Sequence, residues 1–594
     1  MPDHIGIRAA MPWADKAGLA AIGAVAAFLL WGFGKAIDQP EVPAAILLGA
    51  FIFVLTHAIL TMSLAGPLRV AQALLGALRL SLPLSALVVW SGLRHPVATD
   101  VLGQASTMGA VCVILLVGAP FLMLRLVAPR DWLRYTALFD TAWTMHLRFL
   151  GGLLFVGMVW LVLLMSNALL ELVRVPLLDW LLAPEWSGFV LTGLLLGIGM
   201  AVVHDLSDTV SPFILFRLLR ILVPVVLLVL IVFVVALPLG GLSDIFGPLS
   251  AAGVLMGMVL LVLTLLNAAI DRSDTRAVGD GWLGRATRFL AIGMVVLCGL
   301  AVWSVAVRVQ QYGWTPQRVV ALLAALMLLA YGIAYAAIAL RGADWKGRLR
   351  AANVRLAIAS VVVAAVLMTP VLNPYRIATS SQIARYDAGR IDPEALPLWE
   401  MAHEWGHAGQ AGLLRLETAD AQPEGARLHE RIALARSARS LSTYRAEDRR
   451  QQLPDRMAKL AELMPVRPVG ASRPDIFAET STYRLETWEE GCNQRLPDGR
   501  PGCVLIFGGF LPDVPPDEQA ILLYRLGDGG VWGGFASFQN GAIAEVQPLM
   551  DPRTGTTPDL GVDDIVRALD GGFDIRPSPA QVLWLGDVPI GPAP

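Results

Sequence analysis

The chain has 594 residues, of which 56% are hydrophobic and 16% are charged, and its formal net charge is -2. Soluble globular proteins carry roughly 25% charged residues, so this composition excludes a single soluble fold. A net charge this close to zero also excludes a protein-wide basic field for nucleic acid. Long uncharged runs fill the first two thirds of the chain, and charged residues concentrate in the last third. We therefore expect a membrane-embedded part followed by a soluble part.

Eleven apolar runs are long enough to cross ~30 Å of hydrocarbon as helices. They occupy residues 17–33, 43–64, 70–93, 106–126, 149–172, 188–203, 221–239, 252–269, 289–307, 319–340 and 356–371. No A-x-A-like cleavage site separates the first run from the second, so we interpret the first as a retained helix. Residues 131–146, between the fourth and fifth runs, predict a separate amphipathic helix along the membrane surface.

The loops between these runs indicate the orientation in the membrane. Alternate loops differ in basic residues: one contains Arg272, Arg276, Arg285 and Arg288, whereas the loop around Asp244 has none. Basic loops stay in the cytoplasm, which places the N-terminus inside. An odd number of crossings then places everything after residue 371 outside.

Three regions follow from this pattern. Residues 1–372 form a multi-pass α-helical membrane bundle of about eleven spans, and a soluble α+β region follows it. Its membrane-proximal part, residues 373–470, is expected to be helical at 394–416, 424–445 and 454–464. Its second part, residues 471–594, is expected to have strands at 504–507, 520–525, 531–538, 542–546 and 581–585, with a helix at 562–569.

The pattern His403-Glu404-x-x-His407 matches H-E-x-x-H, the zinc-peptidase motif. On a helix, residues four apart share a face, so both imidazoles could bind one zinc ion and Glu404 could act as the general base. Gly406 weakens such a helix, and the third ligand stays open among Glu417, Glu424 and Glu430. The alternative, which the sequence favours, is an amphipathic helix with two histidines on a solvated face and no bound cofactor.

Two ionisable residues, His57 and Arg79, lie inside predicted spans. Because burial in lipid is costly, such residues are candidates for function. They are the basis of a transporter-like alternative in which both face a polar cavity. The structural alternative for a lone histidine is an interhelical hydrogen bond. Separately, Gly193-x-x-x-Gly197 predicts close helix packing.

Cys492 and Cys503 lie in a polar loop that contains Gly and Pro. A pair that closes so short a loop predicts a disulfide if the region is extracytoplasmic, and two free thiols if it is cytosolic. The predicted orientation favours the disulfide.

Several short motifs occur in a fixed order along the chain: YGWTPQRV at 312–319, NPYR at 373–376, SSQ at 380–382, DAGRID at 387–392 and YRLGDGGVW at 524–532. In this order they resemble a bacterial multi-pass membrane family known as domain of unknown function 4153. The resemblance covers most of the chain. It implies an inner-membrane protein with a C-terminal domain outside the cytoplasm, and it implies no reaction, ligand or catalytic residue. In that family the stretch corresponding to 403–407 is usually a helix without the two histidines.

The prediction is thus a non-catalytic bacterial inner-membrane protein that presents a periplasmic α+β domain to an envelope protein or a small molecule. Two alternatives remain open: a membrane-embedded zinc metallohydrolase using the H-E-x-x-H motif, and a transporter-like bundle with a polar cavity. The composition itself implies the lipid bilayer as a partner and no nucleic acid, and it leaves the oligomeric state open.

Overall fold

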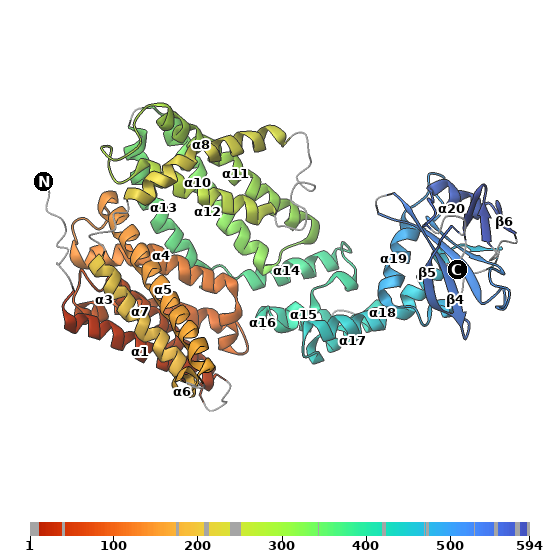
Figure 1. Ribbon diagram of the computed structural model, residues 1–594, viewed down its shortest axis with the longest axis horizontal. Coiled ribbons are helices and arrows are strands. Elements are labelled where there is room, and N and C mark those ends of the chain that lie inside the picture. The colour runs from red at the N-terminus through yellow and green to blue at the C-terminus, as the bar shows by residue number, and fades with distance from the viewer. Residues whose placement is uncertain are drawn as a thin grey trace. The chain divides into compact units, whose positions relative to one another are not determined.

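The computed structural model describes residues 11–37, 42–173, 177–206, 213–237, 251–342, 344–418, 423–468, 470, 474–527, 529–551, 556–576 and 582–590. The chain divides into two compact units, Met1–Gly425 and Ala426–Pro594. The first unit is a bundle of long apolar helices, and the second combines helices with β-sheets (Figure 1).

The first unit contains the membrane-spanning part. Its helices up to residue 367 are α1 (Trp13–Ala36), α2 (Ala44–Leu64), α3 (Val70–Gly92), α4 (Ala105–Val127), α5 (Tyr135–Leu172), α6 (Leu177–Leu182), α7 (Ser187–Leu206), α8 (Phe213–Ala236), α10 (Ala251–Ile270), α11 (Trp282–Tyr312), α12 (Pro316–Leu340) and α13 (Trp345–Leu367), with a 3-10 helix η1 at Ala98–Gly103. In the described part, 11 of these are long and apolar enough to cross a membrane. The predicted multi-pass bundle of about eleven spans is confirmed.

Local sequence explains where these helices begin. Thr315 caps α12, because its Oγ1 accepts a hydrogen bond from the backbone N–H of Arg318 at 3.3 Å and Pro316 occupies the first helical position. A helix separate from the fifth span, expected at 131–146, is not formed, because most of that stretch forms the first turns of the 38-residue helix α5. Phe139 of this stretch is buried against Phe216 of α8.

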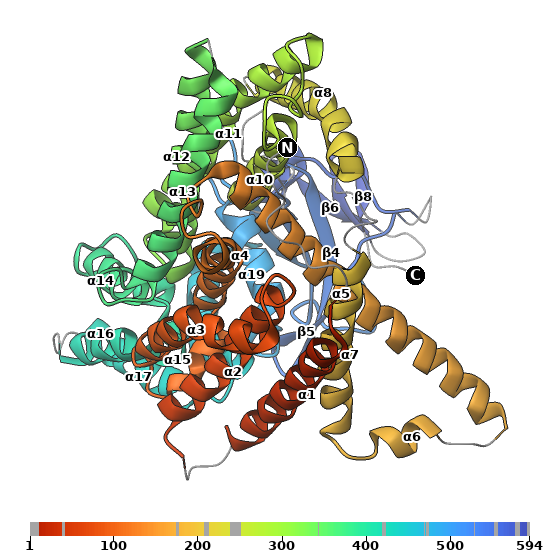
Figure 2. The same cartoon turned by 90° about the vertical axis from the view of Figure 1, so that its left-hand side faces the viewer.

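The spans form two groups (Figure 2). In the first group α1 packs on α2 and α7, α2 on α3, and α5 on α4 and α7. In the second group α11 packs on α8, α10 and α12 around fully buried side chains such as Leu265, Leu290 and Met294. The last span, α13, joins the groups because it contacts α12 on one side and α4 and α5 on the other.

Close approach of α1 and α7 depends on glycine. A Cβ atom at Gly193 would lie 2.1 Å from the backbone oxygen of Gly23, and one at Gly197 would lie 2.2 Å from that of Leu19. The packing predicted from Gly193-x-x-x-Gly197 is therefore present inside the bundle, between the first and sixth spans.

Arginines satisfy the carbonyl groups at the end of α10. Arg350 of α13 donates to the backbone oxygens of Ile270 at 2.7 Å and Asp271 at 3.1 Å. Arg220 of α8 donates to the backbone oxygen of Ala268 at 2.9 Å and pairs with the Asp271 carboxylate at 2.5 Å. The last carbonyls of a helix have no partner within the helix, so these contacts bind three spans together at one end of the bundle.

The first unit continues beyond the last span. It includes α14 (Pro374–Asp387), the 3-10 helix η2 (Pro393–Ala395), α15 (Leu398–His403) and α16 (Gly406–Thr418). Residues 373–418, assigned from sequence to the membrane-proximal soluble part, thus pack with the bundle.

The second unit begins within α17 (Pro423–Ser437) and continues with α18 (Leu441–Leu463), η3 (Pro474–Phe477) and α19 (Thr482–Asn493). The expected helix boundaries at 445 and 454 are wrong, and the chain breaks at 438–440 instead. Ser440 caps α18 there by accepting a hydrogen bond from the N–H of Thr443 at 3.1 Å. Pro454 lies inside α18 rather than at the start of a new helix.

A five-stranded sheet in the order β1-β2-β3-β4-β5 forms the centre of this unit. Its strands are β1 (Val466–Arg467), β2 (Cys503–Phe507), β3 (Gln519–Arg525), β4 (Val531–Gln539) and β5 (Ala542–Pro548); β1 is parallel to β2 and the others are antiparallel. A second sheet contains β6 (Phe573–Arg576), β7 (Val582–Leu585) and β8 (Val588–Ile590), and α20 spans Val562–Leu569. The predicted α+β class is confirmed.

Both faces of the central sheet are covered. Alternate residues of β3, such as Leu522 and Tyr524, face a core shared with α18 and α19. The residues between them, Ile521 and Leu523, face a core shared with α20 and the small sheet. This explains why β2 and β3 are almost continuously apolar, as strands buried on two faces are.

Candidate functional site at the exit from the bundle

The chain leaves the last span through a polar junction whose residues come from distant parts of the sequence. Arg94, just after α3, donates from Nη2 to the backbone oxygens of Leu367 at 3.0 Å and Thr369 at 2.5 Å. Its neighbour His95 is 3% exposed and meets the ring of Tyr375 edge-on, with 5.0 Å between ring centroids. The loop after α3 therefore holds both the end of α13 and the start of α14.

Helix α14 also contacts the turn between α11 and α12. The side-chain amide of Gln382 donates to the backbone oxygens of Tyr312 at 3.1 Å and Trp314 at 2.9 Å. Arg385 donates to the backbone oxygens of Gln310 at 3.2 Å and Gln311 at 2.8 Å, at the C-terminal end of α11. The start of α14 therefore contacts the loop after α3, and its later turns contact α12 and the turn that precedes it (Figure 1).

The H-E-x-x-H stretch belongs to this junction, but it is not one helix. Helix α15 ends at His403 and α16 begins at Gly406, so the expected continuous helix 394–416 is wrong. Gly406 has φ +56°, and a Cβ atom there would lie 2.3 Å from the backbone oxygen of Arg94. The backbone N–H of His407 donates to that same oxygen at 2.8 Å. The break is therefore imposed by docking against the loop after α3.

The residues around the break do not fit a zinc site. His403 stacks on Trp399, with 4.8 Å between ring centroids. Among the described residues no three His, Cys, Asp or Glu side chains are grouped so that they could hold a metal ion. Glu417 and Glu430 supply no third ligand, and the side chain of Glu424 lies outside the described residues. No reaction step through zinc follows from this arrangement.

Burial shifts the pKa values of two ionisable side chains in the junction, His95 and Glu404. It lowers the pKa of His95 to about 4, with further lowering by the positive charge of Arg94 and by His407. Burial also raises the pKa of Glu404, helped by Glu400 and opposed by His403. His95 is therefore neutral near pH 7, and its buried Nε2 has no hydrogen-bond partner within the described ranges.

The two ionisable residues predicted inside spans do not meet. His57 of α2 hydrogen-bonds through Nδ1 to Ser81 Oγ of α3 at 3.2 Å and stacks on Phe53. This is the interhelical hydrogen bond expected for a lone histidine. Arg79 is exposed on the surface of α3.

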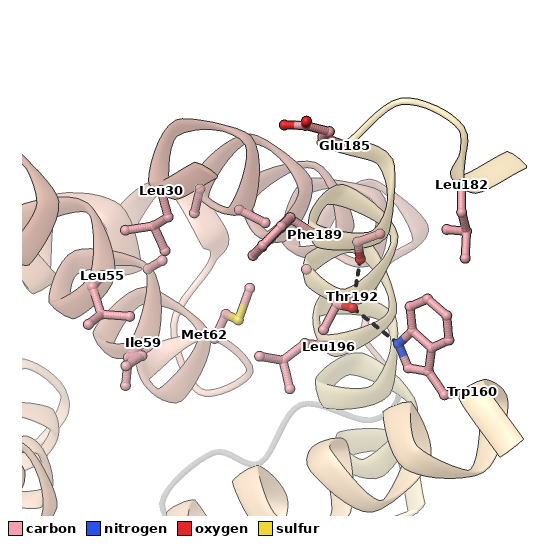
Figure 3. Close-up of a pocket in the computed structure, with 16 residues that line it drawn as sticks. Leu30, Leu55, Ile59, Met62, Trp160, Leu182, Glu185, Phe189, Thr192 and Leu196 are labelled. Carbon is pink, nitrogen blue, oxygen red and sulfur yellow. Dashed lines mark hydrogen bonds between the residues drawn. The ribbon is translucent and has the colours of Figure 1, made fainter. Parts of the chain in front are cut away.

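A cavity of about 570 Å³ lies between α1, α2, α5, α6 and α7 (Figure 3). Its walls are mainly apolar, with side chains such as Leu30, Leu55 and Phe189, and neither His57 nor Arg79 lines it. Its polar groups are Glu185 and the pair in which Trp160 Nε1 donates to Thr192 Oγ1 at 3.1 Å. Its walls suit hydrocarbon, and Glu185 is the one charged residue among those that line it.

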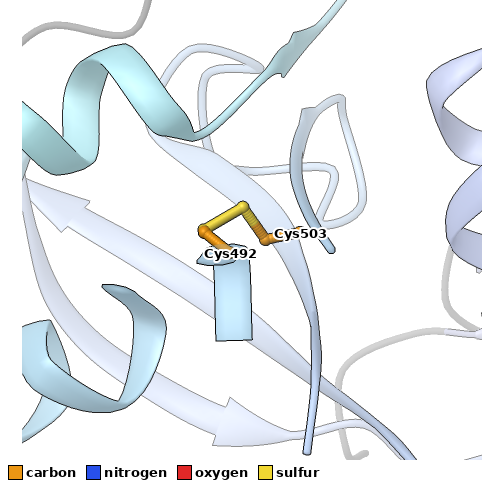
Figure 4. Close-up of a disulfide and its surroundings, with 2 residues drawn as sticks. All are labelled: Cys492 and Cys503. Carbon is orange, nitrogen blue, oxygen red and sulfur yellow. A yellow bond between two sulfur atoms is a disulfide. The ribbon is translucent and has the colours of Figure 1, made fainter. Parts of the chain in front are cut away.

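The predicted disulfide Cys492–Cys503 is confirmed in the second unit (Figure 4). It joins the end of α19 to the first residue of β2, and both cysteines are fully buried. A bond that locks the helix to the sheet is a structural element of this unit.

Sequence reasoning missed Arg94, His95, Gln382 and Arg385 as junction residues. The signal available was their position, because each is a polar residue next to the end of a span or on the first helix after the last span. Gln382 and its partners Tyr312 and Trp314 also lie in the short motifs noted above. Two of these motifs are thus in direct contact.

Comparison with protein-family models, with curated proteins and with solved structures finds no match.

Proposed function

We propose that this chain is a bacterial inner-membrane protein that holds its C-terminal α+β unit in the periplasm to bind an envelope protein or a small ligand. The observation that carries the proposal is a buried disulfide in a unit attached to a multi-pass bundle. Disulfides persist in oxidising compartments and are rare in the cytosol. The loop charges, which favour a cytoplasmic N-terminus, and the resemblance to domain of unknown function 4153 support the same placement.

A binding role is favoured over the zinc hydrolase and the transporter because the described residues provide a supporting site for neither. The two histidines of the H-E-x-x-H stretch flank a helix break and lack a third ligand among the described residues. His57 is engaged with Ser81, and the cavity in the bundle is apolar.

The edge strand β5 is the surface of the α+β unit best suited to a partner. Both faces of the central sheet are covered, whereas β5 pairs only with β4 among the described strands. Glu545, Gln547 and Pro548 on this strand are exposed. An edge strand offers backbone groups to which an extended segment of a partner can add.

The compartment is tested by the redox state of Cys492 and Cys503 in intact cells. A Cys112→Ser/Cys298→Ser background removes both free thiols. We expect a maleimide-polymer gel shift at Cys492 and Cys503 only after reduction under denaturing conditions. Free thiols in freshly lysed cells, together with an inactive C-terminal alkaline phosphatase fusion, would contradict a periplasmic unit.

The binding role is tested by a photocrosslinking residue placed in the full-length chain. At Gln547 on β5 we expect a discrete adduct with an envelope component. At Asp513, an exposed loop residue of the same unit, we expect none. Equal adduct patterns at both positions, or no adduct at Gln547 in cells grown under varied conditions, would argue against β5 as the partner surface.

A further inference from the structure

Three arginines lie near one another at the end of the bundle where α11 stops, and two of them contact one exposed aromatic ring. The guanidinium carbon of Arg308 lies 5.7 Å from the ring centroid of Tyr312, and that of Arg318 lies 5.4 Å from it. Arg385 reaches the same place from α14, where it donates to the carbonyls of Gln310 and Gln311. Arg308 and Arg385 both lie close enough to Arg318 to repel its positive charge.

No carboxylate of the described residues pairs with these three arginines. Across the described ranges, none of the three guanidinium groups lies within ion-pairing distance of Asp or Glu, whereas other arginines of the chain, such as Arg220 and Arg350, have acidic partners. The C-terminal end of a helix carries a partial charge of about -0.5. The end of α11 therefore offsets only a small part of three full positive charges.

Donor groups remain available for a ligand. Arg318 uses Nη1 for the backbone oxygen of Gly313 at 2.8 Å, and Arg385 uses two N–H groups for α11. Each guanidinium has five N–H donors, so both keep donors to spare. Arg308 is exposed and lies against the ring of Tyr312, and its guanidinium makes no hydrogen bond or ion pair with the described residues.

The position of the cluster selects the ligand. Arg308 and Tyr312 lie in the last turns of a membrane-spanning helix, and Tyr312 is 54% exposed. Tyrosine and tryptophan at such positions lie at the level of the lipid headgroups. The guanidinium fork matches the oxygens of a phosphate group and binds them with two parallel hydrogen bonds.

We propose that Arg308, Arg318 and Arg385 bind the phosphate group of a phospholipid headgroup, with Arg308 as the side chain that contacts it directly. The ring of Tyr312 holds two of the three guanidinium groups in place. The site requires only the level of the headgroups, so it does not depend on which side of the membrane this end of the bundle faces.

The test is native mass spectrometry of the full-length protein in detergent with added dioleoyl-phosphatidylglycerol. We expect the wild type to retain one lipid that Arg308→Gln binds about tenfold more weakly, as for the loss of one hydrogen bond to a charged group. Arg308→Lys keeps the charge without the fork and is expected to lie between them. Arg376→Gln is the matched control, because Arg376 is exposed on the same helix as Arg385 but outside the cluster.

Three results would overturn the proposal. Equal lipid retention by wild type and Arg308→Gln would show that the cluster does not bind the headgroup. Equal retention of dioleoylglycerol, which lacks the phosphate, would show that the phosphate is not recognised. Displacement of the lipid by inorganic phosphate at the same concentration would identify a site for a free anion. If Arg308→Gln does not fold, lipid retention is compared between wild type and Arg308→Lys, and equal retention by these two would overturn the proposal.

Discussion

At the scale of single residues, Gly406 decides the form of the exit junction. Its positive φ and the 2.3 Å separation from the Arg94 oxygen make it the one position in the H-E-x-x-H stretch where no side chain fits. The H-E-x-x-H stretch, which resembled a zinc site in sequence, therefore forms a turn that packs against the loop after α3. Each histidine makes a contact other than metal binding. The ring of His403 stacks on Trp399, and the backbone N–H of His407 donates to the Arg94 oxygen.

Gly406→Ala is expected to destabilise the bundle. Left-handed backbone costs a residue with a Cβ atom about 1–3 kcal/mol, and the clash with the Arg94 oxygen adds to this. Gly389→Ala is the matched control, since Gly389 has φ +63° but open space around its Cβ position. Melting in detergent, followed by tryptophan fluorescence, is expected to show a clearly larger loss for Gly406→Ala. Equal losses would contradict the docking role.

The buried imidazole of His95 predicts a pH dependence. Its pKa is lowered to about 4 in the folded protein, against 6.5 for an exposed histidine, so the unfolded state binds more protons between these values. Stability is therefore full above pH 6.5 and falls as the pH falls towards 4. Glu404, whose pKa is raised, acts in the opposite direction. His95→Phe keeps the ring against Tyr375 and is expected to flatten the fall in melting temperature.

The control for this pH series is His429→Phe, which removes an exposed histidine. It is expected to leave the pH profile unchanged. A His95→Phe profile that parallels the wild type from pH 7 to pH 4.5 would contradict a neutral, buried His95.

At the scale of elements, the contact of α1 with α7 depends on the absence of side chains. Gly197→Ala places a methyl group 2.2 Å from the Leu19 oxygen, and overpacking of this kind costs about 1–3 kcal/mol. Gly32→Ala on α1 is the control, because nothing lies within 4 Å of its Cβ position. We expect Gly197→Ala to lower the melting temperature and Gly32→Ala to leave it unchanged or raise it. The reverse order would refute the packing.

In the second unit, the disulfide Cys492–Cys503 fixes the contact between α19 and β2. It closes a loop between residues 11 apart in sequence, and cross-linking a loop of this size stabilises by about 3 kcal/mol in the chain-entropy model. The double variant Cys492→Ala/Cys503→Ala is expected to unfold at lower temperature than the wild type, with no further effect of reductant. Cys112→Ser, which alters an exposed free thiol, is expected to behave as wild type. Equal melting of all three chains would show that the bond is dispensable.

Sequence patterns predicted elements better than contacts between them. The spans followed from apolar length alone, and the strands at β2 to β5 followed from apolar runs bounded by turns such as Asn540-Gly541. The break at Gly406 could not be predicted, because its cause is the Arg94 carbonyl more than 300 residues earlier. For Arg385 and Gln382 the position and the short motifs marked the residues, but their partners could not be predicted because they are backbone oxygens, which every residue has.

At the scale of the whole molecule, the contacts between loops separate into two sets. At one end of the bundle, the loop after α10 pairs through Arg272 with Asp140 in the first turns of α5 and through Asp280 with Lys346 in the first turn of α13. The loop with Arg94, the turn at Gly313 and helix α14 belong to the other end. Among the described residues these hydrogen bonds and ion pairs do not join one set to the other, as expected if successive spans cross in opposite directions.

Thiol labelling can test this separation in intact cells. With Cys112→Ser as background, we introduce Thr275→Cys at the first end and Ser380→Cys at the second; both positions are exposed. The proposed orientation predicts that a membrane-impermeant maleimide labels Ser380→Cys in spheroplasts and Thr275→Cys only after permeabilisation. Labelling of both from the same side would contradict the alternation, and the reverse pattern would invert the orientation.

The contacts made by the helices that are translated last have a consequence for synthesis and membrane insertion. The ribosome releases α11 before α14 and α10 before α13, yet the carbonyls ending α11 and α10 find their partners on Arg385 and Arg350. Arg94 likewise can form its hydrogen bond to the Leu367 oxygen only after α13 has been translated. Spans can enter the bilayer one by one, but their ends stay incomplete until the chain has been synthesised past residue 385. A nascent chain that stops at the last span is thus a membrane-inserted but unfinished molecule, open to surveillance by proteases.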